Sequence, residues 1–396
     1  MADDMRIDKI RVLLLSFVPL ELEGAGTSRL LNYLLDFLLK KPAIEQLTVC
    51  TLGSVEKKIL SLSSRYCYLT FKGFRLKFLQ DISPSMIRYV LQYVLRNIER
   101  HRLRVLIVGS SLTCIFIALL LRLFSPEVRI VQIPQLHKDF IFRDKIAKFL
   151  YKLKRWVFIY LINFKIVQPT LIVYSREEEN IVAPFAQNII RSPLGIDLEK
   201  YTKIKKELNI KTHNEKLTLL HIGEIHRNKF PIFALEVMKT LKELTNNRVR
   251  LIAVGRIHKG YYRKLKEKIK SYGLEDIIRL TGLVSEDKLL EYWRRADTFV
   301  VFSASEAGPF VVLEAMAHGI PVVATRVGIV PELEACGMLL AANYGDVSEM
   351  VNKIIKLWKD EKFRSSLIRK ATEQLPSYDA KYFLEVVYHT LILSSA

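Results

Sequence analysis

The sequence predicts an α/β protein built from two doubly wound domains, and three observations support this. The chain has 396 residues, which is long for a single hydrophobic core. Short apolar segments, several ending at glycine, alternate with segments of helical periodicity, as expected for βαβ units around a parallel sheet. This alternation occurs twice, once in each half of the chain.

The two halves meet in a segment with turn-forming residues, Asn188–Tyr201, which contains Pro193, Gly195 and Asp197. Proline and glycine at such spacing mark a loop rather than a strand or helix. We therefore expect an N-terminal domain, a C-terminal domain and a final helix that crosses back to the N-terminal domain. Their expected bounds are 1–190, 191–375 and 376–396.

In the first half, short apolar runs are typical of strands buried on both faces, and longer segments have helical spacing. The expected strands are Ile10–Val18, Leu47–Leu52, Val105–Gly109, Val128–Ile133 and Leu171–Ser175, and the expected helices are Ser28–Leu39, Met86–Glu99 and Thr113–Phe124.

The second half repeats the pattern, and its strands are expected at Leu217–Ile222, Val249–Val254, Ile277–Thr281, Thr298–Phe302 and Pro321–Thr325. The helices are expected at Pro231–Leu244, Tyr261–Tyr272, Ser285–Arg295, Val311–His318, Met350–Leu357 and Phe363–Glu373. Ligands of such sheets bind beyond the carboxyl ends of the strands. A site is thus expected in the loops after Val18, Ile222, Val254 and Phe302.

Composition limits the classes of protein. Half of the residues are apolar, which argues against wholesale disorder. The net charge of +20 suits nucleic acid, anionic lipid or a phosphorylated substrate without choosing among them. The apolar stretches fall short of the ~20 residues of a membrane-spanning helix, and the acidic residues near the N-terminus lead us to expect no signal peptide. The cysteines, which form no CxxC pair, suit a reducing compartment; they are Cys50, Cys67, Cys114 and Cys336. We expect a cytoplasmic protein, with a peripheral position on the inner face of the cell membrane as the alternative.

The loop after Phe302 offers an anion site. A helix N-terminus follows it, where unpaired N–H groups and a partial positive charge favour a diphosphate. Gly308 allows a close backbone approach, and Pro309 suits a first helical turn. Glu314 lies about one turn into the helix, where a carboxylate suits the hydroxyls of a ribose. Glu306 lies in the loop and could face a sugar, although both acids could equally be an ordinary helix acid and a surface acid.

The surrounding residues resemble a known signature. Glu306 and Glu314 flank seven residues and precede Ala315–Ala324, and the match extends to Gly328 and Pro331–Leu333. This resembles the signature of family 4 glycosyltransferases, which are retaining enzymes of GT-B fold. The resemblance implies two Rossmann-like domains that face each other across a cleft, the first binding the acceptor and the second the nucleotide-sugar donor.

The resemblance also implies roles for these residues. Glu306 would act at the donor sugar, and Glu314 would bind the ribose. The phosphates would be contacted by the backbone between them, at Gly308, Pro309, Phe310 and Val311.

A second loop, Gly223–Lys229, resembles the family's GR-xxxx-KG loop, whose arginine and lysine hold the diphosphate. Lys229 occupies the lysine position. The arginine position holds Glu224, and Arg227, three residues further on, is the candidate to supply the missing charge. Both cations could instead be solvated loop residues.

Two further residues are candidates on weaker patterns. Gly26 lies in a strand-to-helix loop that the family places beside donor and acceptor, but it could equally belong to an ordinary turn. His137 follows a predicted strand at a position where the family often has a histidine near the reacting sugar, and it could instead be structural. No histidine spacing or carboxylate cluster predicts a bound metal.

The segment Arg143–Lys165 has seven basic residues among aromatic and aliphatic ones. It favours an amphipathic helix on an anionic membrane surface, and the alternative is a core helix with a solvated cationic face. Nucleic acid is a less favoured partner because no recognition motif accompanies the charge.

The sequence thus predicts a retaining, metal-independent hexosyltransferase without a cofactor. Its donor would be a UDP- or GDP-sugar and its acceptor a hydroxyl of a glycan, lipid-linked sugar or protein. The alternatives are a non-catalytic nucleotide-sugar-binding protein, a same-fold epimerase or phosphorylase, and a nucleic-acid binder.

Overall fold

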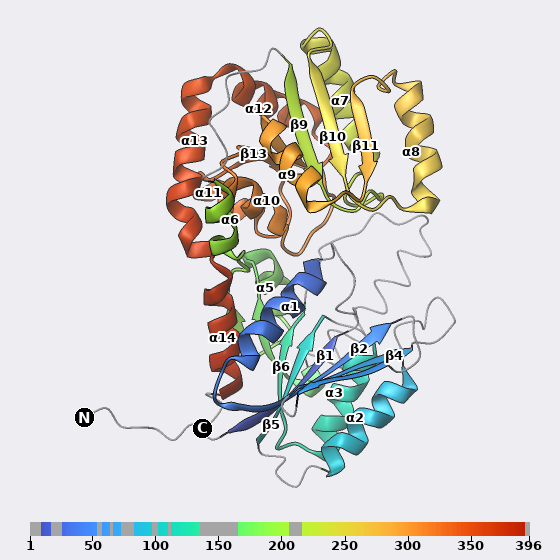
Figure 1. The fold of residues 1–396 in the computed structure, drawn as a ribbon, viewed down its shortest axis with the longest axis vertical. Coiled ribbons are helices and arrows are strands. Elements are labelled where there is room, and N and C mark those ends of the chain that lie inside the picture. The colour runs from blue at the N-terminus through green and yellow to red at the C-terminus, as the bar shows by residue number, and fades with distance from the viewer. Residues whose placement is uncertain are drawn as a thin grey trace, which may run out of the picture.

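The computed structural model describes most of the chain in two stacked domains (Figure 1). The described residues are 9–16, 26–53, 58–63, 66–72, 83–96, 102–109, 112–134, 165–205 and 216–392. His137 and residues 143–164 of the basic segment lie outside these ranges.

The N-terminal domain holds an eight-stranded sheet in which only β3 runs antiparallel to its neighbour among the described pairs. Its helices are α1 (Gly26–Leu39), α2 (Pro84–Arg96), α3 (Leu112–Phe124) and α5 (Arg176–Val182). Its strands in spatial order are β3 (Lys58–Ser63), β4 (Tyr66–Lys72), β2 (Ile44–Gly53), β1 (Ile10–Ser16), β5 (Leu103–Val108), β6 (Arg129–Ile133), β7 (Thr170–Val173) and β8 (Ile189–Arg191).

Strand β1 explains why the sequence shows a continuous apolar run rather than an alternating one. Val12 and Leu14 belong to a core cluster with α1, whereas Leu13 and Leu15 belong to the opposite cluster with α2 and α3. Because successive side chains point to opposite faces, a strand covered on both faces needs apolar residues at every position.

The C-terminal domain holds a six-stranded parallel sheet. Its order is β11 (Ile278–Gly282), β10 (Val249–Val254), β9 (Leu217–Ile222), β12 (Thr298–Val301), β13 (Val322–Thr325) and β14 (Leu340–Ala342). This is the doubly wound order in which the chain reverses direction across the sheet between β9 and β12, the position where ligands bind in such folds.

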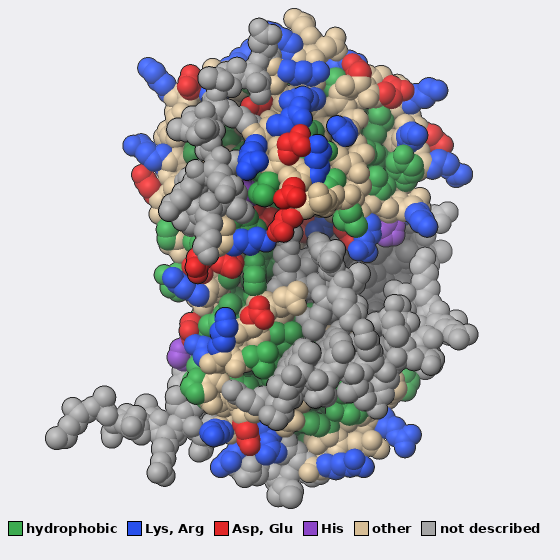
Figure 2. All heavy atoms as spheres, viewed as in Figure 1, with side chains coloured by type: hydrophobic (Ala, Val, Ile, Leu, Met, Phe, Trp, Pro, Cys, Tyr) green, Lys and Arg blue, Asp and Glu red, His purple; other side chains and the backbone are tan. Residues whose placement is uncertain are grey.

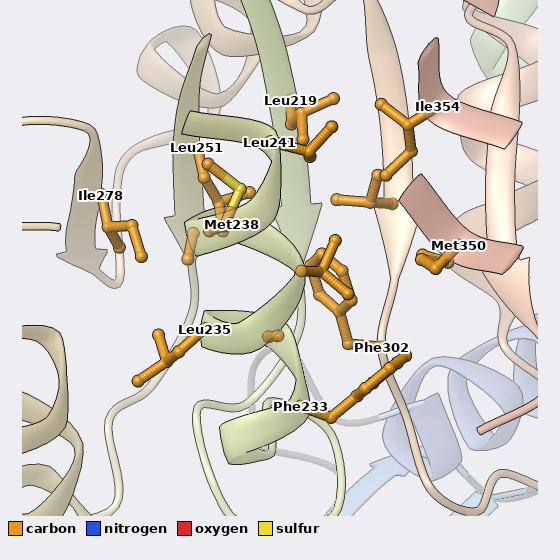
Figure 3. Packing of buried hydrophobic residues seen from close by; sticks show 14 of the residues in the cluster. Leu219, Phe233, Leu235, Met238, Leu241, Leu251, Ile278, Phe302, Met350 and Ile354 are labelled. Atoms are coloured by element: carbon orange, nitrogen blue, oxygen red, sulfur yellow. The ribbon is translucent and has the colours of Figure 1, made fainter. Parts of the chain in front are cut away.

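Helices cover both faces of this second sheet. One face packs against α7 (Ile232–Leu244), α8 (Lys259–Ser271) and α12 (Val347–Lys359), with Met238 and Leu241 of α7 over Leu219 and Leu251 (Figure 3). The other face packs against α9 (Glu286–Arg295), α10 (Phe310–Ala317) and α11 (Val330–Ala335). The remaining elements are α6 (Leu198–Lys205), α13 (Glu361–Gln374), the 3₁₀ helix η3 (Leu375–Tyr378) and α14 (Ala380–Ile392).

Several elements were not predicted. β3 and β4 form an antiparallel edge pair, and β8 and β14 have three residues each. Such short or edge strands lack the long apolar run that marks a buried central strand. The predicted loop near Asn188 therefore contains a strand, β8, which pairs with β7.

The chain crosses between the domains twice, and the two crossings are hydrogen-bonded to each other. The N–H of Ile196 donates to the carbonyl of Tyr378 at 3.0 Å, and the N–H of Ala380 donates to the carbonyl of Ile196 at 2.9 Å. After the second crossing, α14 buries Phe383 and Val387 in the core cluster of the N-terminal domain. The last helix of the chain therefore packs in the first domain (Figure 1).

No helix within the described ranges has both the length and the apolar content to cross a membrane. On the face drawn in Figure 2, Lys and Arg are spread over both domains with Asp and Glu among them.

Gly195 permits the close approach of the two crossings, and replacing it tests their role. A Cβ at this position would lie 2.4 Å from the carbonyl oxygen of Tyr378. We expect Gly195→Ala to lower the free energy of unfolding by about 1–3 kcal/mol, as for other overpacked sites. Gly260→Ala is the matched control, because nothing lies within 4 Å of its Cβ position in α8 and alanine favours a helix. Calorimetry that shows equal stability for both variants would contradict this role.

Candidate functional site

The loop between β12 and α10 lies at the contact between the domains. A Cβ on Gly308 would lie 3.7 Å from the ring of Tyr174, which follows β7 in the N-terminal domain. Ala307 and Phe310 pack with the core cluster of that domain. The predicted phosphate-binding loop, which includes Pro309 at the N-cap of α10, is therefore held in place by both domains.

The two glutamates of the signature occupy different environments. Glu306 is in the loop with a side chain 11% exposed, and its carboxylate accepts a hydrogen bond from the hydroxyl of Ser303 at 3.0 Å. Glu314 lies in α10 and is buried. The Ser303 hydroxyl thus helps to orient the Glu306 carboxylate.

Lys229 and Glu306 form an ion pair that joins the loops after β9 and β12. The Lys229 ammonium lies 3.2 Å from the Glu306 carboxylate, and the N–H of Ala304 donates to the carbonyl of Asn228 at 2.7 Å. These loops follow the two strands at which the sheet order reverses. The chain therefore places a cation and a carboxylate, 77 positions apart in sequence, at the expected ligand position of the fold.

A buried histidine lies beneath this pair. His221 on β9 is 2% exposed, its Nδ1 lies 3.0 Å from the carbonyl of Val300, and burial lowers its pKa to about 4. The neutral ring must donate through Nδ1, since a carbonyl only accepts. Its Nε2 lies 3.5 Å from the Cβ position of Gly223 and has no hydrogen-bond partner among the described residues. Gly223 is thus packed between His221 and the stem of Lys229.

Arg227 lies apart from Lys229 in the same loop. It lines a cavity of about 670 Å³ together with Tyr261 and Lys264. Glu224 lies 3.9 Å from the imidazole of His226. Arg227 as a diphosphate ligand therefore remains a prediction, whereas Lys229 lies within ion-pair distance of Glu306.

A second cavity, of about 790 Å³, lies between the domains and is bordered by Glu306. The other predicted site residues that the structure describes do not line it. Two acids in its walls form hydrogen bonds across the domain boundary. Glu177 of α5 accepts a hydrogen bond from the N–H of Gly328 at 2.9 Å, and Glu332 of α11 accepts one from the N–H of Arg176 at 2.7 Å. Sequence reasoning missed Glu177; the run of acids in the first turn of α5 was the available signal.

The remaining candidates are placed as follows. Gly26 is the first residue of α1, at the loop position expected from the sequence, and Val311 follows Phe310 in the first turn of α10. His137 lies outside the described residues. Within the described ranges, no group of three His, Cys, Asp or Glu side chains could hold a metal ion.

Comparison with solved structures identifies the fold. Sucrose-phosphate synthase from Thermosynechococcus elongatus matches with a TM-score of 0.75 and 15% identity, over 98% of this chain and 100% of that one. Anabaena Alr3699/HepE in complex with UDP and glucose matches with a TM-score of 0.69 and 15% identity, over 96% and 99%. The chain has the GT-B fold, which confirms the predicted fold class of two Rossmann-like domains.

Sequence comparison finds similarity to known proteins in the second domain. Residues 202–374 match the model of glycosyl transferases group 1. A sulfoquinovosyl transferase of Arabidopsis thaliana is 32% identical over 195 residues, 47% of this chain and 36% of that protein. A D-inositol 3-phosphate glycosyltransferase of Thermobifida fusca is 32% identical over 146 residues, 35% of this chain and 34% of that protein. The matched segments thus span about a third of these relatives, and the match to the glycosyl transferases group 1 model lies within the C-terminal domain.

Two buried histidines make stability depend on pH. Burial lowers the pKa of His318 to about 4, like that of His221, and the ring of His318 stacks on Trp293 at 4.7 Å. An unfolded chain protonates these rings below pH ~6.5, whereas the folded protein keeps them neutral down to about pH 4. The unfolded state then binds more protons, so we expect stability to fall as the pH drops from 6.5 to 4.

Replacement of His318 by Phe tests this linkage and keeps an aromatic ring on Trp293. The slope of unfolding free energy against pH should decrease by up to about 1.4 kcal/mol per unit between pH 4 and 6.5, the value for one proton. At pH 7 the His318 ring of the wild type is neutral in both the folded and the unfolded state, so its protonation does not contribute to stability at that pH. Urea unfolding across this range measures the slope, and an unchanged slope in the variant would refute the assignment.

Proposed function

We propose that the protein is a retaining glycosyltransferase that moves a hexosyl group from a nucleotide-diphospho-sugar to an acceptor hydroxyl. The observation that carries the proposal is the Lys229–Glu306 pair at the position where the sheet order reverses, next to the start of α10. A group 1 glycosyl transferase domain around this pair supports it. UDP-sugars are the favoured donors, because a structural neighbour, Anabaena Alr3699/HepE, has a structure in complex with UDP-glucose; GDP-sugars are the alternative.

In this proposal the donor displaces the ion pair between Lys229 and Glu306. The diphosphate draws the Lys229 ammonium from Glu306, and the positive end of α10 adds to the stabilisation of negative charge. The released Glu306 carboxylate then accepts hydrogen bonds from the hexose hydroxyls. Glu314, further along α10, binds the ribose.

The transfer step follows from retention of configuration. The bond between the anomeric carbon and the diphosphate breaks, and the acceptor oxygen forms a bond to that carbon on the same face. The acceptor proton passes to an oxygen of the departing phosphate. Lys229 stabilises the charge that builds on the diphosphate, which lowers the barrier of this step. In the proposed step, Lys229 and the N-terminus of α10 stabilise the diphosphate, and no metal ion takes part.

The acceptor is a glycan, a lipid-linked sugar or a protein hydroxyl. The basic segment Arg143–Lys165 supports attachment to an anionic membrane surface as a further prediction, and an intracellular position on the inner face of the cell membrane accompanies it. Liposome flotation of the full chain checks this prediction, and binding should weaken with salt because ions screen the attraction.

A non-catalytic nucleotide-sugar-binding protein is the second candidate. It is favoured by Glu224 at the position where the family has an arginine, and by the location of Arg227 in another cavity. Such a protein would bind a donor through Lys229 but release no nucleoside diphosphate.

Release of nucleoside diphosphate from a panel of UDP- and GDP-sugars tests the transferase. Glu306→Gln keeps the size of the side chain but removes its charge, and Lys229→Ala removes the cation. Each should reduce kcat by on the order of 10²–10³, the effect of removing one transition-state stabiliser. Lys362→Ala, at an exposed position of α13, is the matched control and should behave as the wild type. Donor binding without turnover in the wild type would instead establish the binding protein.

A further inference from the structure

The cavity that Arg227 lines is separate from the proposed donor site. Its walls come from the loop after β9 with the start of α7, from the first turns of α8, and from the loop after β14. The helices α7 and α8 cover one face of the second sheet, whereas α10, which carries Glu314, covers the other face. Neither Lys229 nor Glu306 is among the wall residues. The volume of about 670 Å³ lies in the range of small-molecule sites.

Two cations without ion-pair partners line this cavity. The Arg227 guanidinium and the Lys264 ammonium make no hydrogen bond or ion pair within the described part of the chain. Burial raises the pKa of Tyr261 and Arg227 opposes this rise, so the guanidinium lies near the Tyr261 ring. A guanidinium with free N–H groups suits the oxygens of a phosphate. The helices α7 and α8 begin beside these cations, and their N-terminal ends add to the positive potential.

The acid in the described walls, Glu236, limits the charge of the ligand. Its carboxylate lies near Tyr344, whose pKa is raised first by burial and then by this carboxylate. It is not ion-paired with Arg227 or Lys264. A ligand that filled the cavity with negative charge would be repelled by Glu236. A ligand with one phosphate at the cations and a hydroxyl at Glu236 suits both, because a carboxylate accepts hydrogen bonds from hydroxyl groups.

Aromatic rings and open glycines shape the rest of the cavity. Phe233 and Tyr344 meet edge to face with their ring centroids 5.4 Å apart, and Tyr344 is 42% exposed. The C–H face of a sugar or the plane of a base can pack on such a wall. Gly260 and Gly345 also line the cavity, and nothing lies within 4 Å of their Cβ positions. The two glycines therefore leave space for a ligand between α8 and the loop after β14.

We propose that this cavity is a binding site for a small phosphate monoester that carries hydroxyl groups. The phosphate binds Arg227 and Lys264, and a hydroxyl of the ligand donates to Glu236. A sugar phosphate and a nucleoside monophosphate share this chemistry. The site goes beyond the proposed transferase function and does not rest on it, since no wall residue has a role in that proposal.

The position of the site has a consequence for the loop after β9. Arg227 and Lys229 flank Asn228, whose carbonyl accepts a hydrogen bond from the N–H of Ala304 at 2.7 Å. One side of this loop thus contributes to the cavity, and the other reaches Glu306 through Lys229. A ligand that holds Arg227 restrains the loop from which Lys229 extends.

Isothermal titration calorimetry of the full chain, without a donor, tests the site. Ribose 5-phosphate and AMP are the probes, ribose is the neutral comparison and inorganic phosphate is the bare anion. At least one probe should bind about tenfold or more tightly than ribose and inorganic phosphate. The tighter of the two probes shows whether the ligand is a sugar phosphate or a nucleotide. Inorganic phosphate that binds as tightly as both probes would indicate an adventitious ion only and overturn the proposal, as would binding of neither probe.

Substitutions separate this site from the proposed donor site. Arg227→Gln should raise the Kd of the bound probe about tenfold or more, as expected for a lost charge-assisted hydrogen bond. Gly260→Leu should also raise the Kd, at unchanged Tm, because its side chain enters the open cavity. Arg263→Gln is the matched control, since this side chain is 92% exposed on α8. Lys229→Ala should leave the Kd unchanged. Binding that is lost in Lys229→Ala but kept in Arg227→Gln would place the anion at the donor loop and overturn the proposal.

Glu236→Ala tests the hydroxyl contact. The variant should raise the Kd of the bound probe several-fold, because the acceptor for the ligand hydroxyl is removed. The affinity for inorganic phosphate should stay the same or increase, since a repelling carboxylate is lost. An unchanged Kd for the probe would overturn the assignment to a hydroxyl-bearing ligand.

Discussion

The constraint on which the two-domain arrangement depends is the pairing of the two chain crossings at Ile196 and Tyr378–Ala380. Because α14 packs in the N-terminal core, the C-terminal domain is connected to the rest at two adjacent points rather than one. Any rotation of one domain relative to the other must therefore have its axis near these two crossings. The close contact at Gly195 fixes where that axis lies.

The same geometry couples the donor loop to the position of the domains. Ala307 and Phe310, which flank Gly308, pack in a cluster that includes Tyr174 of the N-terminal domain. Opening the domains would expose these apolar side chains and release the loop. In the proposed function, donor binding and domain closure would stabilise each other, since both require the same loop conformation.

Much of the fold could be predicted from the sequence, because burial in the sheets requires apolar runs and such runs also favour strands. β5, for example, is buried at all six positions, and its last four residues, Val105–Val108, form the apolar run that predicted it. Lys229 and Glu306 were each suggested as donor-binding residues by motif resemblance. Their ion pair was not predicted, because it depends on the order of strands in the sheet. The buried Ser305 hydroxyl, which has no hydrogen-bond partner among the described residues, could not be predicted. Its environment is formed by α5 and the loops after β12 and β13, which are far apart in the sequence. Glu177 was missed for a similar reason: its partner is a backbone N–H 151 positions away.

The loop that carries Glu306 packs closely against the loop after β13. A Cβ at Gly328 would lie 2.4 Å from the carbonyl oxygen of Ala307, and its φ of +54° is a left-handed conformation that favours glycine. The loop after β13 therefore packs directly on the backbone of the loop that carries Glu306, and Glu177 of the other domain accepts a hydrogen bond from the N–H of Gly328. A movement of the loop after β13 would also move Ala307 and the adjacent Glu306. In the proposed retaining transfer, the acceptor hydroxyl and the leaving phosphate lie on one face of the sugar, so the packing at Gly328 would set how closely the two substrates meet.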